Sequence, residues 1–196
     1  MSVPEPAPSR FPGLLMLVGG LAAVGAVFLE WYTPADPQPG EEKLTGLQTL
    51  SGLSVLVLGG IIVLLGIVHL VRGRGRGLAV AGLILGILVT AAGAYTSFLP
   101  ESAFLKVDAD RIAKSNDVSD EELGEFKSFL EEAFDSGLLN IKPGIGAYVA
   151  LGGGLIALVG GLLGAASRRP LATPAAYPTA AYPPPEAPQP PQGPLR

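Results

Sequence analysis

The side chains that could support catalysis or metal binding are few in this sequence and lie far apart. There is no cysteine, and the one histidine, His69, lies at the opposite end of an apolar segment from most of the acidic residues. A catalytic triad or a zinc site needs histidine or cysteine close to carboxylates. We therefore expect no catalytic, metal or cofactor site, and a protein that is not an enzyme.

Two remaining features suggest weaker chemistry. The densest group of carboxylates could bind calcium loosely, but it lacks the alternating oxygen ligands and central glycine of an EF-hand loop. The group is better explained as the solvated start of a helix, where the positive end of the helix dipole stabilises acidic side chains. His69 lies one turn before Arg72, so we expect it at a membrane boundary, with a proton-binding role as the alternative. The acidic group comprises Asp117, Asp120, Glu121, Glu122 and Glu125.

Long apolar runs fill most of the chain and predict a membrane protein. Its 196 residues are 48% hydrophobic and 15% charged, against about 25% charged in soluble proteins. A helix needs roughly 20 mostly apolar residues to cross a bilayer. We therefore expect an all-α fold with a four-helix transmembrane bundle over residues 11–166. The four segments are 11–32, 50–71, 77–99 and 145–166.

The first segment could instead be a signal peptide. It ends in Glu30-Trp31-Tyr32 without a clear cleavage site. We therefore expect it to be retained as a helix, followed by a plain connector over 33–43.

Basic residues predict the orientation, because positively charged loops resist translocation. With the N-terminus inside, the inner face carries most of the arginines, and aromatic residues mark the outer helix ends. We expect a plasma-membrane protein with both termini in the cytoplasm and inner arginines near lipid headgroups. So small a basic patch does not suggest nucleic-acid binding. The inner arginines are Arg10, Arg72, Arg74, Arg76, Arg168 and Arg169; the outer aromatics are Trp31, Tyr32, Tyr95, Phe98 and Tyr148.

The extracytoplasmic loop over 100–144 is long enough to be structured. Ser119 and Glu122 form an S-x-x-E capping box that predicts a helix over about 119–136, ended by Gly137. A weaker helix is expected over 108–114. The loop helix has an apolar face, which we expect to cover the bundle or the lipid interface, with a partner protein as the alternative. That face comprises Phe126, Phe129, Leu130 and Phe134.

Both ends of the chain read as disordered. Residues 1–10 are rich in proline, and residues 167–196 repeat Ala-Ala-Tyr-Pro and contain P-x-x-P frames. Such composition favours a solvated, extended chain. The tail could also dock to an aromatic groove of a partner.

Small residues recur along one face of each apolar segment. Helices in lipid associate through close backbone approach at such faces. We expect them to pack within one bundle, with formation of a homo-oligomer as the alternative. The packing glycines are Gly52, Gly59, Gly66, Gly82, Gly86, Gly93, Gly153, Gly160 and Gly164.

The hairpin of the second and third segments, with GLAVAGLILG over 77–86, resembles a widespread class of small bacterial membrane proteins of unknown function. Many of these have a tail rich in proline and tyrosine. The resemblance implies a bacterial cell membrane and carries over no catalytic residue. We expect a non-catalytic accessory or scaffold protein, with a small transporter or channel subunit that works as an oligomer as the alternative.

Overall fold

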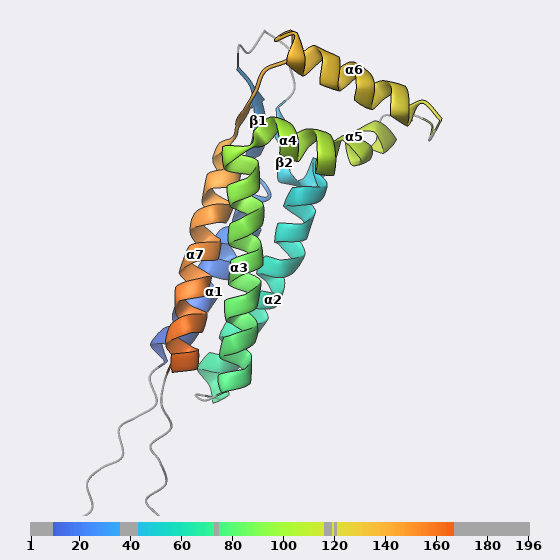
Figure 1. Ribbon diagram of the computed structural model, residues 1–196. Helices are drawn as coiled ribbons and strands as arrows, with labels where there is room; N and C mark the ends of the chain where they lie inside the picture. The colour runs from blue at the N-terminus through green and yellow to red at the C-terminus, as the bar shows by residue number, and fades with distance from the viewer. Residues whose placement is uncertain (1–9, 36–42, 73–74, 116–118, 120, 167–196) are drawn as a thin grey trace, which may run out of the picture.

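Four apolar helices lie side by side in the computed structural model, which describes residues 10–35, 43–72, 75–115, 119 and 121–166 (Figure 1). They are α1 (Phe11–Ala26), α2 (Leu50–Arg72), α3 (Arg76–Phe98) and α7 (Ile145–Ala166). The last three are long and apolar enough to cross a membrane. α7 covers the same residues as the fourth predicted segment, α2 differs from the second by one residue at its C-terminal end, and α3 differs from the third by one residue at each end.

α1 is shorter than the predicted helix over 11–32, which is wrong at its C-terminal end. The helix stops at Ala26, passes through a turn, and continues as strand β1 (Glu30–Pro34). The side chain of Trp31 folds back, and its Nε1 donates a 2.8 Å hydrogen bond to the carbonyl oxygen of Ala26. Aromatic residues and a threonine in Trp31-Tyr32-Thr33 favour extended structure. Apolar character continues across this change, so the hydropathy of the sequence did not reveal it.

The fold is mostly helical, as expected, and it also contains a small antiparallel sheet that was not predicted from the sequence. Its order is β2–β1–β3, where β2 is Leu44–Thr45 and β3 is Ile141–Pro143. Tyr32 pairs with Leu44 on one side, and Thr33 pairs with Lys142 on the other. The segment predicted as a plain connector therefore begins as a strand that ties the first loop to the end of the long one. A 3-10 turn, η1 (Gly46–Gln48), leads from β2 to α2.

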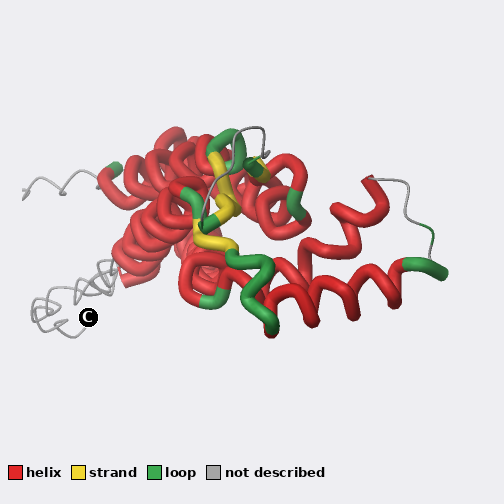
Figure 2. Tube along the Cα trace, turned by 90° about the horizontal axis from the view of Figure 1, so that it is seen from above, coloured by secondary structure: helices red, strands yellow, loops and turns green. Residues whose placement is uncertain are grey.

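The long loop forms helices that lie across one end of the bundle (Figure 1). α4 (Pro100–Ala103), the π-helical turn η2 (Phe104–Asp108) and α5 (Ala109–Ser115) follow one another directly, and α6 (Leu123–Asp135) comes after them. Seen along the bundle axis, α5 and α6 extend beyond the edge of the four long helices (Figure 2). We call the strands, η1, η2 and α4–α6 together the cap.

The predicted signals at the two ends of α6 are present. The hydroxyl of Ser119 donates to a carboxylate oxygen of Glu122 over 2.8 Å, and the backbone N–H of Glu122 donates to the Ser119 hydroxyl over 3.3 Å. Gly137 has a φ of 73°, which favours glycine and ends the helix. α6 itself begins at Leu123, four residues after the predicted start.

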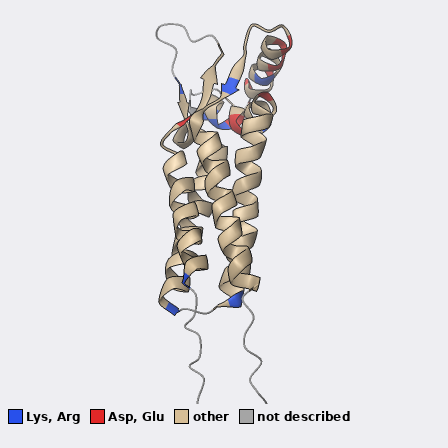
Figure 3. Ribbon diagram, turned by 90° about the vertical axis from the view of Figure 1, so that its left-hand side faces the viewer, with Lys and Arg blue, Asp and Glu red and all other residues tan. Residues whose placement is uncertain are grey.

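Charged side chains lie at the two ends of the bundle, and the long middle section is uncharged (Figure 3). Large apolar side chains cover the outside of that section, among them Leu14, Val57, Leu64, Ile84 and Leu162. In water such a surface would be costly, whereas lipid tails solvate it well. The three long helices thus have the surface of membrane-spanning segments.

Candidate functional site

A fully buried carboxylate, that of Asp108, lies where the cap meets the bundle. Its Oδ2 accepts a 2.6 Å hydrogen bond from the Tyr32 hydroxyl, and its Oδ1 accepts a 2.8 Å bond from the backbone N–H of Ser51. The Ser51 hydroxyl lies 2.9 and 3.0 Å from the two oxygens. Both oxygens are thus paired, which offsets the cost of burying a carboxylate.

Ser51 belongs to the first turn of α2, where backbone N–H groups have no partner within the helix. The Thr49 hydroxyl caps α2 locally by accepting from the backbone N–H of Gly52 over 3.0 Å, and the Asp108 carboxylate adds a second cap from a position 57 residues beyond Ser51. The partial positive charge of the helix N-terminus favours a carboxylate here. Asp108 therefore joins the long loop to the start of a membrane-spanning helix.

The Tyr32 phenol is held in its neutral form. Burial raises its pKa well above the usual range, and the negative charge of Asp108 and the hydrogen bond to it raise the pKa further. The Thr96 and Ser51 hydroxyls act in the opposite direction and are outweighed. Tyr32 therefore remains a hydrogen-bond donor to Asp108 at any physiological pH.

The π-helical turn of η2 brings Asp108 into this position. Such turns insert one extra residue per turn and rotate the side chains that follow. Phe104, in the same turn, packs edge-on against Tyr32 with ring centroids 5.5 Å apart and against Phe134 of α6 at 6.0 Å. A continuous chain of contacts therefore runs from β1 through η2 to α6.

This cluster, Tyr32, Ser51 and Asp108, is named the latch here. Sequence reasoning treated Asp108 only as the start of a weak helix and missed its role. A usable signal was present, since Phe104, Ala109 and Ile112 surround it with an apolar helical face. Within the described residues, no three histidine, cysteine, aspartate or glutamate side chains come together as a metal site would require. The latch pairs a carboxylate with donors, and its chemistry is that of a structural link.

The predicted face of α6 is divided by the structure. Leu130 is 6% exposed, and Phe126 and Phe134 are partly buried against the core of the cap. These three cover the protein itself, as we favoured from the sequence. Phe129 does not share that face and is 64% exposed, so it does not cover the protein itself. It directly precedes Leu130 in the sequence, so it lies about 100° around the helix from that side chain.

The packing glycines face neighbouring helices of the same chain. A Cβ placed on Gly86 would lie 2.7 Å from the backbone nitrogen of Leu158, and one on Gly153 would lie 2.8 Å from the carbonyl oxygen of Gly19. Glycine thus permits backbone contact of α7 with α3 and with α1. Gly93 and Gly160 make similar backbone approaches from α3 and α7. Gly164 meets the Ala79 side chain, Gly59 and Gly66 meet α1, Gly52 meets η1, and Gly82 meets the Met16 side chain.

The arginines predicted at the inner face are only partly described. Arg72 ends α2 and Arg76 begins α3, and Arg10 precedes α1 at the same end of the bundle. Arg74, Arg168 and Arg169 lie outside the described residues, as do the proline-rich tail and residues 1–9. We call the end marked by Arg10, Arg72 and Arg76 the basic end.

Comparison with protein-family models, curated proteins and solved structures finds no match for this chain.

Proposed function

We propose that this chain is a non-catalytic scaffold of the bacterial plasma membrane, with four spans, a cap outside the cell and both termini in the cytoplasm. The cap is the part of the chain that carries this function. The latch fixes the cap to the bundle, and α6 presents a contact face to a protein partner.

The fourth span in this proposal is α1 with the turn that follows it. Phe11 to Leu29 at helical rise would cover about 28 Å, close to the roughly 30 Å of a hydrocarbon core. The exposed side chains along it are large and apolar, namely Leu14, Val18, Leu21, Phe28 and Leu29. α1 also packs between α2 and α7 at Gly19 and Gly20. These features favour a lipid environment for α1 like that of its neighbours.

The orientation follows from the charges at the two ends. Every acidic residue that the structure describes lies in the cap or directly before α6, and Arg10, Arg72 and Arg76 lie at the basic end; charged residues lie at both ends of the bundle in Figure 3. Basic residues stay on the cytoplasmic side. The cap therefore faces outward in this proposal.

The interior of the bundle favours a scaffold over a pore. Its buried side chains between the two ends are small or apolar, such as Ala23, Val55, Ile62 and Val89. The hydroxyl of Thr90, near the middle of α3, donates to the backbone carbonyl of Gly86 in its own helix over 2.7 Å. A channel or transport subunit would line aligned faces with polar groups, and the described helices supply no such face.

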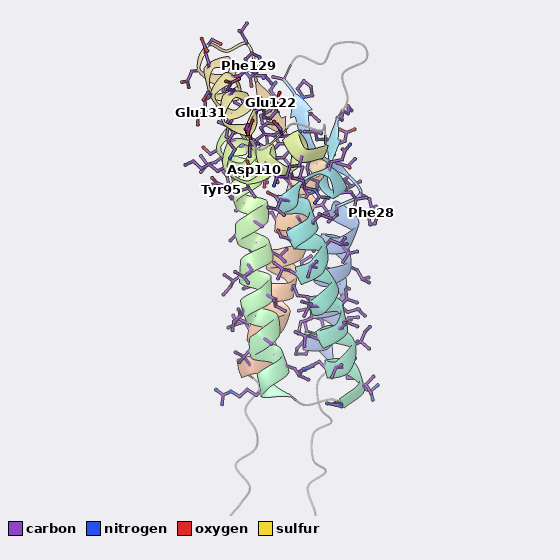
Figure 4. The ribbon with its side chains drawn as sticks, turned by 90° about the vertical axis from the view of Figure 1, so that its right-hand side faces the viewer. Phe28, Tyr95, Asp110, Glu122, Phe129 and Glu131 are labelled. Atoms are coloured by element: carbon purple, nitrogen blue, oxygen red, sulfur yellow. The ribbon has the colours of Figure 1, made fainter. Side chains whose placement is uncertain are left out.

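The outer face of α6 carries the proposal about a partner. Phe129 stands exposed on α6 (Figure 4). Glu125 and Glu132, one turn away on either side, are also exposed. Lys127 does not neutralise these glutamates, because its ammonium lies 2.5 Å from Asp110 of α5. An aromatic anchor framed by acids suits a basic segment of a partner protein.

The test of this face is site-specific photocrosslinking in native membranes. A photoreactive residue at Phe129 should give one discrete crosslinked product, and the same residue at Glu101 of α4 should give none. The double variant Glu125→Lys/Glu132→Lys should lose the product at Phe129, because its charges would repel a basic partner. Equal crosslinking at both sites, or a product that survives charge reversal, would contradict the proposal.

The topology has its own test, made simple by the absence of cysteine from the chain. Ser136→Cys, after α6, should react with a membrane-impermeant maleimide in intact cells. Ser9→Cys, before α1, should react only after the membrane is permeabilised. Labelling of Ser9→Cys from outside would show that the chain does not cross four times in the proposed orientation.

A further inference from the structure

The one histidine of the chain is buried at the basic end. His69 lies in the last turn of α2 and is only 4% exposed. The sequence suggested an interfacial side chain that water could reach. The structure instead places the imidazole between helices.

The imidazole fits because neighbouring helices present small residues to it. A Cβ placed on Gly13 of α1 would lie 3.2 Å from Cδ2 of the ring, and one on Gly164 of α7 would lie 3.6 Å from Cε1. The same Cβ on Gly164 would lie 2.8 Å from the Cβ of Ala79 in α3. The ring thus fills a space left by Gly13 and Gly164, close to Ala79.

The ring nitrogen Nδ1 is buried, and no described residue forms a hydrogen bond with it. Leaving a buried polar atom unpaired costs free energy that an apolar side chain would not. Leucine or methionine would fill such a site without that cost. Histidine at position 69 therefore differs from leucine or methionine in one useful property, which is that it can bind a proton.

The charges around the site are all positive in the described part of the chain. Arg10 stands at the start of α1, Arg72 lies one turn beyond His69 on α2, and Arg76 lies one turn before Ala79 on α3. α7 has no acidic or basic residue, and its one tyrosine, Tyr148, lies at the cap end. No described carboxylate is near enough to balance an imidazolium here.

We propose that His69 is a proton-binding site, and that its protonation from the cytoplasmic side loosens the basic end of the bundle. Protonation of the neutral ring places a buried positive charge among three arginines, and the hydrogen that Nδ1 then carries has no described acceptor. Moving α2 away from α1 and α7 lets water reach the ring and relieves both costs. Acid therefore favours the loosened form in this proposal.

Pairs of spin labels measure this movement directly, because the chain has no cysteine of its own. Val71→Cys on α2 and Leu162→Cys on α7 place labels at exposed positions near the basic end. In nanodiscs the distance between them should lengthen or broaden between about pH 8 and about pH 5, the range in which histidine changes charge. The same labels with His69→Gln should show one distribution throughout. A second pair near the cap, Phe98→Cys and Tyr148→Cys, should stay unchanged in both.

Thermal unfolding gives a second readout that does not depend on labels. The wild-type Tm should fall as the pH is lowered across this range, and the Tm of His69→Gln should change less. If the variant fails to fold, His69→Leu replaces it, since leucine suits an apolar site. The proposal would be overturned if the distances between the labels in the wild type did not change with pH, or if a pH response persisted in the variant without His69. Neither outcome bears on the partner face of α6.

Discussion

The hydroxyl of Tyr32 lies 2.6 Å from Oδ2 of Asp108, a residue 76 positions away in the sequence. This bond joins the strand after α1 to the helices of the long loop. With Ser51 at the start of α2, it brings together three parts of the chain that only meet at the cap. The cap depends on this meeting point more than on any local helix signal.

Tyr32→Phe should lower the free energy of unfolding by about 1.5–3 kcal/mol, the usual worth of a hydrogen bond to a charged group. The ring and its contact with Phe104 would remain, so the loss would report the hydroxyl alone. Tyr148→Phe is the matched control, because Tyr148 is 51% exposed and should have little effect. The measurement is chemical or thermal unfolding in detergent. Equal effects of the two changes would show that the Tyr32–Asp108 bond contributes nothing.

Asp108→Ala should release the cap while the bundle stays folded. It would leave the Ser51 N–H and the Tyr32 hydroxyl unpaired, at about 1–3 kcal/mol each. Hydrogen exchange should then become faster in α4, η2 and α5, and α7 should keep its protection. Asp110→Ala is the control, since Asp110 is exposed and contacts Lys127 of α6. Faster exchange spread evenly over the cap and α7 would mean that the latch does not act locally.

Tyr32 should resist ionisation at high pH. Its folded-state pKa is raised above the ordinary value of 10.0, so its contribution to stability is complete below about pH 10. The unfolded state loses its proton first as the pH rises, and stability falls from there upward. Near-ultraviolet absorbance should give the same native titration for wild type and Tyr32→Phe, whereas after unfolding the wild type should show one more titrating tyrosine than the variant. A native titration that includes Tyr32 with the exposed tyrosines would contradict this.

The sequence revealed the long helices because their signal is local. A run of apolar residues in α2, α3 or α7 needs no knowledge of the rest of the fold, and charges or glycines mark its ends. The end of α1 was harder, because Phe28, Leu29, Trp31 and Tyr32 continue the apolar run through a turn and into a strand. Hydropathy does not distinguish these conformations.

The latch and the site of His69 are properties of tertiary contacts. Asp108 stands next to exposed acidic and basic residues, and its burial results from the π-helical turn and from the meeting with Ser51 and Tyr32. His69 resembles an interfacial residue until Gly13 and Gly164 are seen around it. Tertiary contacts also decide which residues of α6 are buried. Helical spacing predicted one apolar face, and only the structure showed that Phe129 lies outside it.

Phe134 and Phe129 should respond differently to the same substitution. Phe134→Ala removes a ring that packs against Phe104. An aromatic pair contributes about 0.5–1.5 kcal/mol, and the cap should lose more than this because apolar burial is lost as well. Phe129→Ala should leave stability within about 0.5 kcal/mol of wild type, as an exposed position does. Hydrogen exchange of α6 measures both. A large loss of protection in Phe129→Ala would mean that this side chain supports the fold and is not free to contact a partner.

Gly86 and Gly152 separate packing inside one bundle from association between copies. Gly86→Ala would place a methyl group against the Leu158 backbone. A backbone cannot change rotamer as a side chain can, so we expect the free energy of unfolding to fall by about 1–3 kcal/mol. A Cβ on Gly152 meets nothing within 4 Å, so Gly152→Ala should be neutral or slightly stabilising through helix propensity. Thermal unfolding tests both changes.

Light scattering in detergent, or crosslinking in nanodiscs, then tests whether the chain forms an oligomer. If Gly152→Leu or Gly60→Leu dissociates a dimer without lowering the Tm, the outer glycines mediate contact between copies. If neither does, the glycine faces act only within the chain.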